Sequence, residues 1–155
     1  GGTPDYSGGT AMADATIEQR LAVLEAKDEI RELTARYCLA VAEGEAETIV
    51  AMFTSDGVFT MRDREFAGTD QLRVMYTGAA DGVSPKPFIQ NHVIEVDGDE
   101  ATGRCGVEIR MVNKGEAYTV AGHYFDRYRK VDGRWLFSRR DFKVYHWVPL
   151  SKGWA

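Results

Sequence analysis

The chain has 155 residues, of which 44% are hydrophobic and 28% are charged, and its formal net charge is −5. These values are ordinary for one globular domain with a substantial core. Because the balance is acidic and no stretch is strongly basic, we expect no nucleic-acid partner. No apolar run approaches the ~20 residues that span a bilayer, so we expect no membrane role. The two cysteines, Cys38 and Cys105, have neither metal-ligand nor disulfide spacing, which predicts a cytoplasmic protein.

The first residues differ in composition from the rest. Residues 1–11 are rich in glycine, and we expect them to be a leader outside the fold, with Met12 as the native start. Neither an internal repeat nor a linker composition follows, so residues 12–155 predict a single domain.

The domain begins with a predicted long helix. Thr16 and Gln19 fit a capping box, in which each side chain satisfies a backbone amide of the other residue. Apolar residues then recur at helical spacing as far as Gly44, a natural helix end. They are Ile17, Leu21, Leu24, Ile30, Leu33, Tyr37 and Val41. The charged residues 27–29 indicate a break between a short first helix and a longer second one.

Shorter elements follow. Residues 45–53 predict a further helix, and residues 58–68 predict a small hairpin that turns at residues 63–64. Thr69 is the expected N-cap of the next helix, which ends at Gly78.

The second half of the chain predicts a sheet. Residues 79–86, rich in Gly, Ser and Pro, indicate a loop, and turn signals at 97–98, 113–115 and 132–133 separate four strands. Apolar and polar residues alternate over 105–111, which places one face of that strand in the interior. The last two strands greatly exceed the usual length of about 5–6 residues, and long strands twist and curl. We therefore predict an α+β domain whose helices pack on the concave face of a curled, mostly antiparallel sheet.

Four segments carry a family pattern in one order: residues 28–33 with Tyr37, 53–59, 91–98 and 128–135. Together they resemble the SnoaL-like branch of the nuclear transport factor 2-like superfamily, which includes scytalone dehydratase, bile acid 7α-dehydratase and hexachlorocyclohexane dehydrochlorinase. The resemblance extends over residues 17–150. It implies a cone-shaped α+β barrel in which the first helix and the concave sheet enclose a deep, mostly apolar cavity.

The chain departs from this family at the two positions of its Asp–His dyad, where it has Ala42 and Pro87. Neither side chain can abstract a proton. The resemblance leaves two candidates in place. Tyr37 matches a catalytic Tyr of the bile acid dehydratase, and Arg140 matches a pocket Arg of the dehydrochlorinase.

Each candidate has two interpretations. Tyr37 lies on the apolar stripe of the helix, either as a core residue with one hydrogen bond or as a phenol directed into the cavity. Arg140 shares a strand face with Phe142 and Val144, so it needs either a buried carboxylate or an anionic ligand. Of these two partners, we favour the ligand.

Three further polar residues are candidates. His146 continues the parity of Arg140, so it lies either at the cavity mouth or, as is commoner near a terminus, on the surface. Only one of Asn91 and His92 can face inward on a regular strand. The apolar alternation favours His92 and the family alignment favours Asn91, which we take as the catalytic candidate.

The remaining cavity wall is predicted from parity and alignment. Gly122 leaves room for a ligand, although Gly in a strand also marks bulges, and Cys38 is expected to behave as a small core residue. The expected substrate-binding residues are Cys38, Val41, Phe59, Met61, Tyr76, His92, Val107, Ile109, Val120, Gly122, Tyr124, Phe142 and Val144.

The resemblance implies a lyase or isomerase that catalyses elimination, dehydration or retro-aldol cleavage of a small apolar substrate, aromatic or polycyclic. Tyr37 would transfer or donate a proton, and Arg140 would stabilise negative charge. The alternative is a non-catalytic binding protein, or a structural subunit resembling the small subunit of ring-hydroxylating dioxygenases.

Histidines and cysteines without ligand spacing predict no metal, and we expect no organic cofactor. We also expect a homo-oligomer. Residues 148–150 match the tail of the dehydrochlorinase, which favours a trimer, with a dimer next.

Overall fold

The computed structural model describes residues 14–78 and 82–154, so the expected leader lies outside the described residues. The helices are α2 (Ile17–Glu43), α3 (Ala46–Val50) and α4 (Gly68–Tyr76), with a final 3₁₀ turn, η3 (Leu150–Lys152). The strands are β1 (Phe53–Met61), β2 (Arg64–Ala67), β3 (Val83–Asp97), β4 (Glu100–Asn113), β5 (Glu116–Val131) and β6 (Arg134–Pro149). This order confirms the predicted α+β class.

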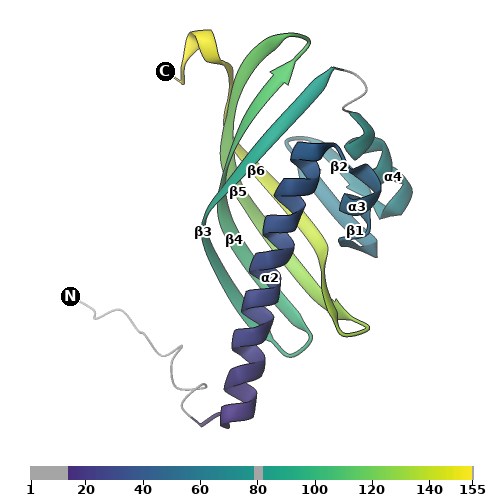
Figure 1. The fold of residues 1–155 in the computed structure, drawn as a ribbon, viewed down its shortest axis with the longest axis vertical. Helices are drawn as coiled ribbons and strands as arrows, with labels where there is room; N and C mark the ends of the chain where they lie inside the picture. Colours follow the sequence, from purple (N-terminus) through teal and green to yellow (C-terminus); the bar gives the residue numbers. More distant parts are fainter. Residues whose placement is uncertain (1–13, 79–81, 155) are drawn as a thin grey trace, which may run out of the picture.

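The six strands form one curled sheet in the order β2-β1-β6-β5-β4-β3. All neighbouring pairs are antiparallel except β1 and β6, which run parallel. Within the described residues the sheet stays open, with β2 and β3 as its edges, so the expected barrel is not closed. Figure 1 shows the long strands bending around α2, with α3 and α4 beside β1 and β2. The predicted four-strand meander, β3 to β6, is confirmed.

The long helix α2 begins and ends as predicted. The Gln19 backbone nitrogen donates to Thr16 Oγ1 at 3.1 Å, and the Thr16 nitrogen donates to Gln19 Oε1 at 2.9 Å. Gly44 ends the helix with φ 71°, a left-handed conformation that glycine adopts without strain. The expected break at residues 27–29 is wrong, because α2 is continuous.

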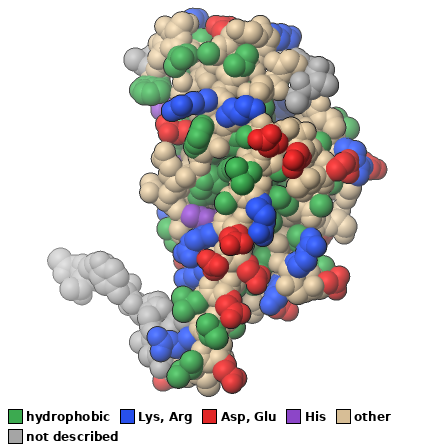
Figure 2. Space-filling view, in the orientation of Figure 1, with side chains coloured by type: hydrophobic (Ala, Val, Ile, Leu, Met, Phe, Trp, Pro, Cys, Tyr) green, Lys and Arg blue, Asp and Glu red, His purple; other side chains and the backbone are tan. Residues whose placement is uncertain are grey.

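The first turns of α2 do not face the core, contrary to the predicted stripe. Ile17, Leu21 and Leu24 are exposed, and the buried face begins at Ala26. Figure 1 shows why, since the N-terminal end of α2 extends past the sheet. In Figure 2 hydrophobic side chains gather at this end, while acidic and basic ones are mixed further along the helix. Among the described residues, no helix is both long enough and apolar enough to cross a membrane.

Several boundaries differ by a few residues from the prediction. Phe53 begins β1 instead of ending a helix, because its backbone pairs with Phe137 of β6. The N-cap of α4 is Ala67, without a side-chain cap, instead of Thr69. The hairpin turns one residue earlier, at residues 62–63. Strand β3 begins at Val83 inside the predicted loop, of which residues 79–81 lie outside the described part of the chain.

Candidate active site

A cavity of about 460 Å³ lies between the helices and the concave face of the sheet. Its wall includes nine residues that the sequence predicted there: Tyr37, Val41, Phe59, Met61, Tyr76, Ile109, Val120, Tyr124 and Phe142. Ile49, Phe66, Met75, Met111 and Trp147 add further apolar surface. Such a wall suits an apolar ligand with few polar atoms.

Two tyrosine hydroxyls meet in this cavity wall. The hydroxyl oxygens of Tyr37 on α2 and Tyr76 on α4 are 2.7 Å apart, so one phenol donates a hydrogen bond to the other. Burial raises the pKa of Tyr37 above its ordinary value of 10.0, and the charge of Arg140 opposes this increase in pKa. Burial also raises the pKa of Tyr76 and of Tyr124 well above that value. All three phenols are therefore neutral hydrogen-bond donors.

Arg140 lies next to this pair but is bound to a protein carboxylate. Its Nε and Nη2 donate to the two carboxylate oxygens of Asp126 at 2.8 and 2.9 Å, and both side chains are 0% exposed. The guanidinium carbon lies 3.7 Å from the ring centroid of Tyr124 and 4.4 Å from those of Tyr37 and Phe137. Our preference for an anionic ligand over a buried carboxylate as the ion-pair partner was therefore wrong.

Asp126 was missed from the sequence, although a signal was present. It lies between Tyr124 and Tyr128 on the inward face of β5, where a carboxylate needs a cationic partner. The partner is Arg140 on the adjacent strand, at the register position opposite Asp126.

The ion pair continues into a hydrogen-bonded chain. The Tyr128 hydroxyl donates to Asp126 Oδ2 at 2.9 Å, and His92 Nε2 lies 3.2 Å from the same hydroxyl. Burial lowers the pKa of His92 below 6.5, while the charge of Asp126 opposes this decrease in pKa. Gly103 makes room for the contact, because a Cβ there would lie 2.8 Å from the Tyr128 hydroxyl oxygen and 3.2 Å from His92 Nε2.

His92, and not Asn91, therefore faces inward. A bulge between Gln90 and Val93 shifts the register of β3, and Asn91 takes a φ of 52° and is exposed. The family alignment gave the wrong choice here, and the apolar alternation gave the right one. Neither side chain lines the cavity.

Comparison with known families matches residues 22–141 to the SnoaL-like domain. The chain belongs to this family. A solved variant of Rv3472, a Mycobacterium tuberculosis protein of unknown function, is 27% identical with a TM-score of 0.75, over 85% of this chain and 77% of its own. An NTF2-like protein with a cystatin-like fold from Novosphingobium aromaticivorans is 25% identical with a TM-score of 0.67, over 92% of each chain.

A type 2 hexachlorocyclohexane dehydrochlorinase is 18% identical with a TM-score of 0.73, over 82% of this chain and 90% of its own. At that identity the likeness concerns the fold alone. No curated protein matches the chain. The SnoaL-like match confirms the family that the sequence resembled.

The two family dyad positions carry no base in this SnoaL-like chain. Pro87 is buried and Ala42 is half-buried, and neither lines the cavity. The Ala42 carbonyl accepts a hydrogen bond from Lys86 Nζ. Among the described residues that line the cavity, none is a histidine, aspartate or glutamate.

The other expected site residues lie away from the cavity wall. Val144 and His146 border a separate hollow beside Trp147, and Val107 is buried. Cys38 is half-buried, and burial raises its pKa to about 11, so it is a thiol. A Cβ on Gly122 would lie 2.0 Å from the Lys143 carbonyl oxygen at a bulge, so this glycine serves strand packing, not a ligand.

One group of side chains has donor types that metals bind. Potential ligand atoms of His92, Cys105 and Asp126 lie within 4.8 Å of one another. However, both Asp126 oxygens already bind the Arg140 cation, and burial raises the pKa of Cys105 to about 12, so it is a thiol. A divalent cation beside an arginine would be repelled, and this group does not fit a metal site.

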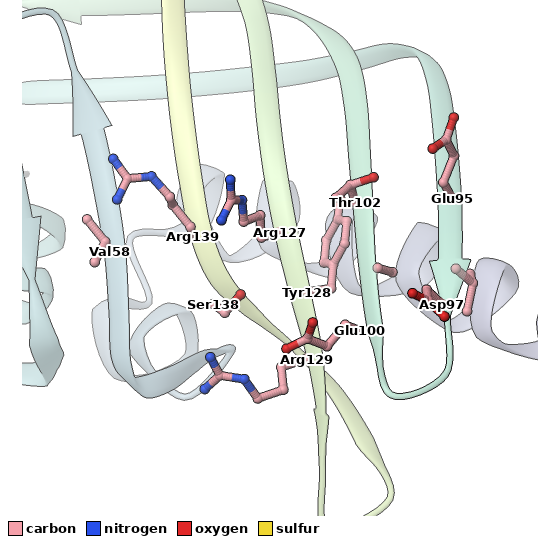
Figure 3. A pocket seen from close by; sticks show the side chains of 12 residues that line it. Val58, Glu95, Asp97, Glu100, Thr102, Arg127, Tyr128, Arg129, Ser138 and Arg139 are labelled. Atoms are coloured by element: carbon pink, nitrogen blue, oxygen red, sulfur yellow. The ribbon is translucent and has the colours of Figure 1, made fainter.

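Another hollow lies on the outer face of the sheet. Figure 3 shows Arg127 and Arg139 on one side of it and Glu95 and Thr102 on the other. It is open and its wall is polar, and Arg139 is already paired with Asp141 at 2.9 Å. An apolar ligand is better matched by the cavity on the concave face.

Proposed function

We propose that the protein is a cofactor-independent lyase or isomerase that acts on a small, largely apolar substrate with one reactive oxygen. The observation that carries this proposal is the contact between the Tyr37 and Tyr76 hydroxyls in an apolar cavity wall. One hydroxyl proton is used between the two phenols, and the other is available to a substrate oxygen.

The phenols act as donors, not as bases, because burial raises the pKa of both. A donor placed in a poorly solvated cavity stabilises negative charge that develops on a carbonyl or hydroxyl oxygen. The guanidinium carbon of Arg140 lies 4.4 Å from the Tyr37 ring centroid, behind the cavity wall. Its positive charge also favours negative charge on the substrate oxygen.

Proton removal from carbon has to use water or a group of the substrate, since no imidazole or carboxylate is among the described residues of the cavity wall. The simplest such substrate is a ketone. When the ketone oxygen accepts a hydrogen bond from the phenol pair, the proton on the α-carbon becomes more acidic. Enolisation is therefore the elementary step we assign to the site. For a carbonyl substrate, elimination of a β-leaving group, double-bond isomerisation and retro-aldol cleavage can all pass through an enolate or enol.

The test uses 2-tetralone, an apolar bicyclic ketone, in D₂O. NMR follows exchange of its α-protons with wild type, Tyr37→Phe and, as a matched control, Tyr145→Phe, which changes an exposed tyrosine of β6. Wild type and the control should accelerate exchange, and Tyr37→Phe should lose about 10²- to 10³-fold. The Tyr37→Phe protein should lose about 1 kcal/mol of stability or less, the scale of one hydrogen bond.

Non-catalytic binding is the second candidate, and the lack of a base among the described wall residues favours it. The same experiment separates the two. Ketone that binds without exchange above the buffer rate supports the binding protein and refutes the enzyme. Ketone and related apolar compounds that fail to bind at all would refute both.

A further inference from the structure

The cavity wall contains one charged side chain among its described residues, Arg64 of the edge strand β2. Arg64 pairs in register with Met61, and Phe66 pairs with Phe59. Since Phe59 and Met61 line the cavity, Arg64 and Phe66 share the concave face. The Arg64 guanidinium carbon lies 4.9 Å from the Phe66 ring centroid.

A second arginine lies in the adjacent turn. Arg62 has φ 57°, and its guanidinium carbon lies 4.5 Å from the ring centroid of Trp147, another residue of the cavity wall. Stacking on an aromatic face leaves the edge of a guanidinium, with its N–H donors, free for a ligand. Arg64 thus lines the cavity, while Arg62 lines the neighbouring hollow, which shares Trp147 with the cavity wall.

Neither arginine has a carboxylate partner in the described parts of the chain. The neighbouring Glu65 lies on the opposite face of β2, because it pairs with Thr60, and its charge acts on Arg139 of the outer face. This differs from Arg140, which is paired with the buried carboxylate of Asp126. The positive charge beside the cavity is left for a ligand.

A third cation lies at the C-terminal end of α2. Lys86 Nζ donates to the Ala42 carbonyl in the last turn of α2, and Val41 and Gly44 of the same region line the cavity. Its charge offsets the negative end of the helix dipole, which would otherwise disfavour an anion there.

We infer that the ligand is an amphipathic anion, with an apolar body in the cavity and a carboxylate bound by Arg64 and Arg62. The inference rests on the proposed binding of a small apolar molecule in the same cavity. Carboxylate oxygens match the planar donor fork of arginine, and the pairing directs the opposite end of the molecule towards the Tyr37 and Tyr76 hydroxyls.

The test compares 2-naphthylacetic acid with its methyl ester, which has the same ring system without the charge. Titration calorimetry at low salt should give a dissociation constant about tenfold lower for the acid, from two partly exposed ion pairs. Arg64→Gln and Arg62→Gln should each weaken acid binding about threefold and leave ester binding within about twofold. The control is Arg104→Gln, whose side chain stacks on Phe125 on the outer face and should change neither constant.

Higher salt supplies an independent readout, because it screens exposed charges: it should weaken binding of the acid and not of the ester. Equal affinity of wild type for acid and ester overturns the inference and leaves the proposed function standing. A preference for the acid that survives both arginine substitutions also overturns it. Failure of both probes to bind refutes the apolar binding cavity itself, and the inference with it.

Discussion

Asp126→Asn isolates the ion pair behind the cavity wall. The substitution keeps the shape of the side chain and removes its charge, so Arg140 becomes a buried cation without a counter-charge. One oxygen is also replaced by an amide group, which cannot accept from both Arg140 and Tyr128 as Asp126 Oδ2 does. Both members of the pair are 0% exposed, and breaking a fully buried pair typically costs about 3–5 kcal/mol.

Urea unfolding measured by circular dichroism gives the loss as the difference in extrapolated unfolding free energy. A surface carboxylate of the same type provides the control. Asp56 pairs with Arg129 at 3.2 Å, with side chains 68% and 42% exposed, so Asp56→Asn should cost less than about 1 kcal/mol. The double variant Asp126→Leu with Arg140→Met removes both charges and should recover most of the stability lost in Asp126→Asn.

The reasoning would be refuted if Asp126→Asn cost no more than the Asp56→Asn control. A double variant as unstable as the sum of its single substitutions would also contradict it, because the two charges would then act independently.

Three further predictions concern the network and the outer face. Burial lowers the pKa of His92 below the ordinary 6.5, so as the pH falls His92 binds a proton more readily in the unfolded chain than in the folded one. The free energy of unfolding should therefore fall as the pH falls below about 6.5. His92→Gln should flatten this pH dependence in unfolding titrations. Gly103→Ala places a Cβ 2.8 Å from the Tyr128 hydroxyl oxygen, and calorimetric melting should show a loss of about 1–3 kcal/mol, whereas an unchanged melting temperature would contradict the packing. Because Phe88 and Phe125 are exposed on the outer sheet face, we expect a homo-oligomer, with a trimer favoured over a dimer. A protein that sediments as a monomer at micromolar concentration would contradict this prediction.

The sequence predicts the fold to the extent that the signals are local. Thr16 with Gln19 and the glycine at position 44 determine the ends of α2 through contacts within a few residues. The turns between β3 and β6 likewise depend on short turn motifs. Ile17, Leu21 and Leu24 show the limit of periodicity, since helical spacing identifies an apolar face without showing how far the sheet beneath it extends.

The site is harder to predict because its contacts join distant segments. Arg140 was found through the family resemblance, but its partner depends on the register between β5 and β6, which two bulges shift. The choice between Asn91 and His92 depends on another bulge, at Gln90 and Val93, which has no composition signal. Arg62 belongs to a turn and Arg64 to an edge strand. In such segments the sequence pattern says little about which face of the sheet a side chain occupies.

The parallel pairing of β1 with β6 imposes an order on biosynthesis. Residues 53–61 find their neighbours at residues 137–142, so β1 and β2 cannot join the sheet while the ribosome is still making the middle of the chain. Until then the apolar side chains of β1 and α3 lack their final cover, and closing so long a loop makes this step slow. The hairpin of β5 and β6 can form locally, and β1 must then add to a preformed edge. The nascent protein therefore depends on its last strands to complete the packing of its first ones.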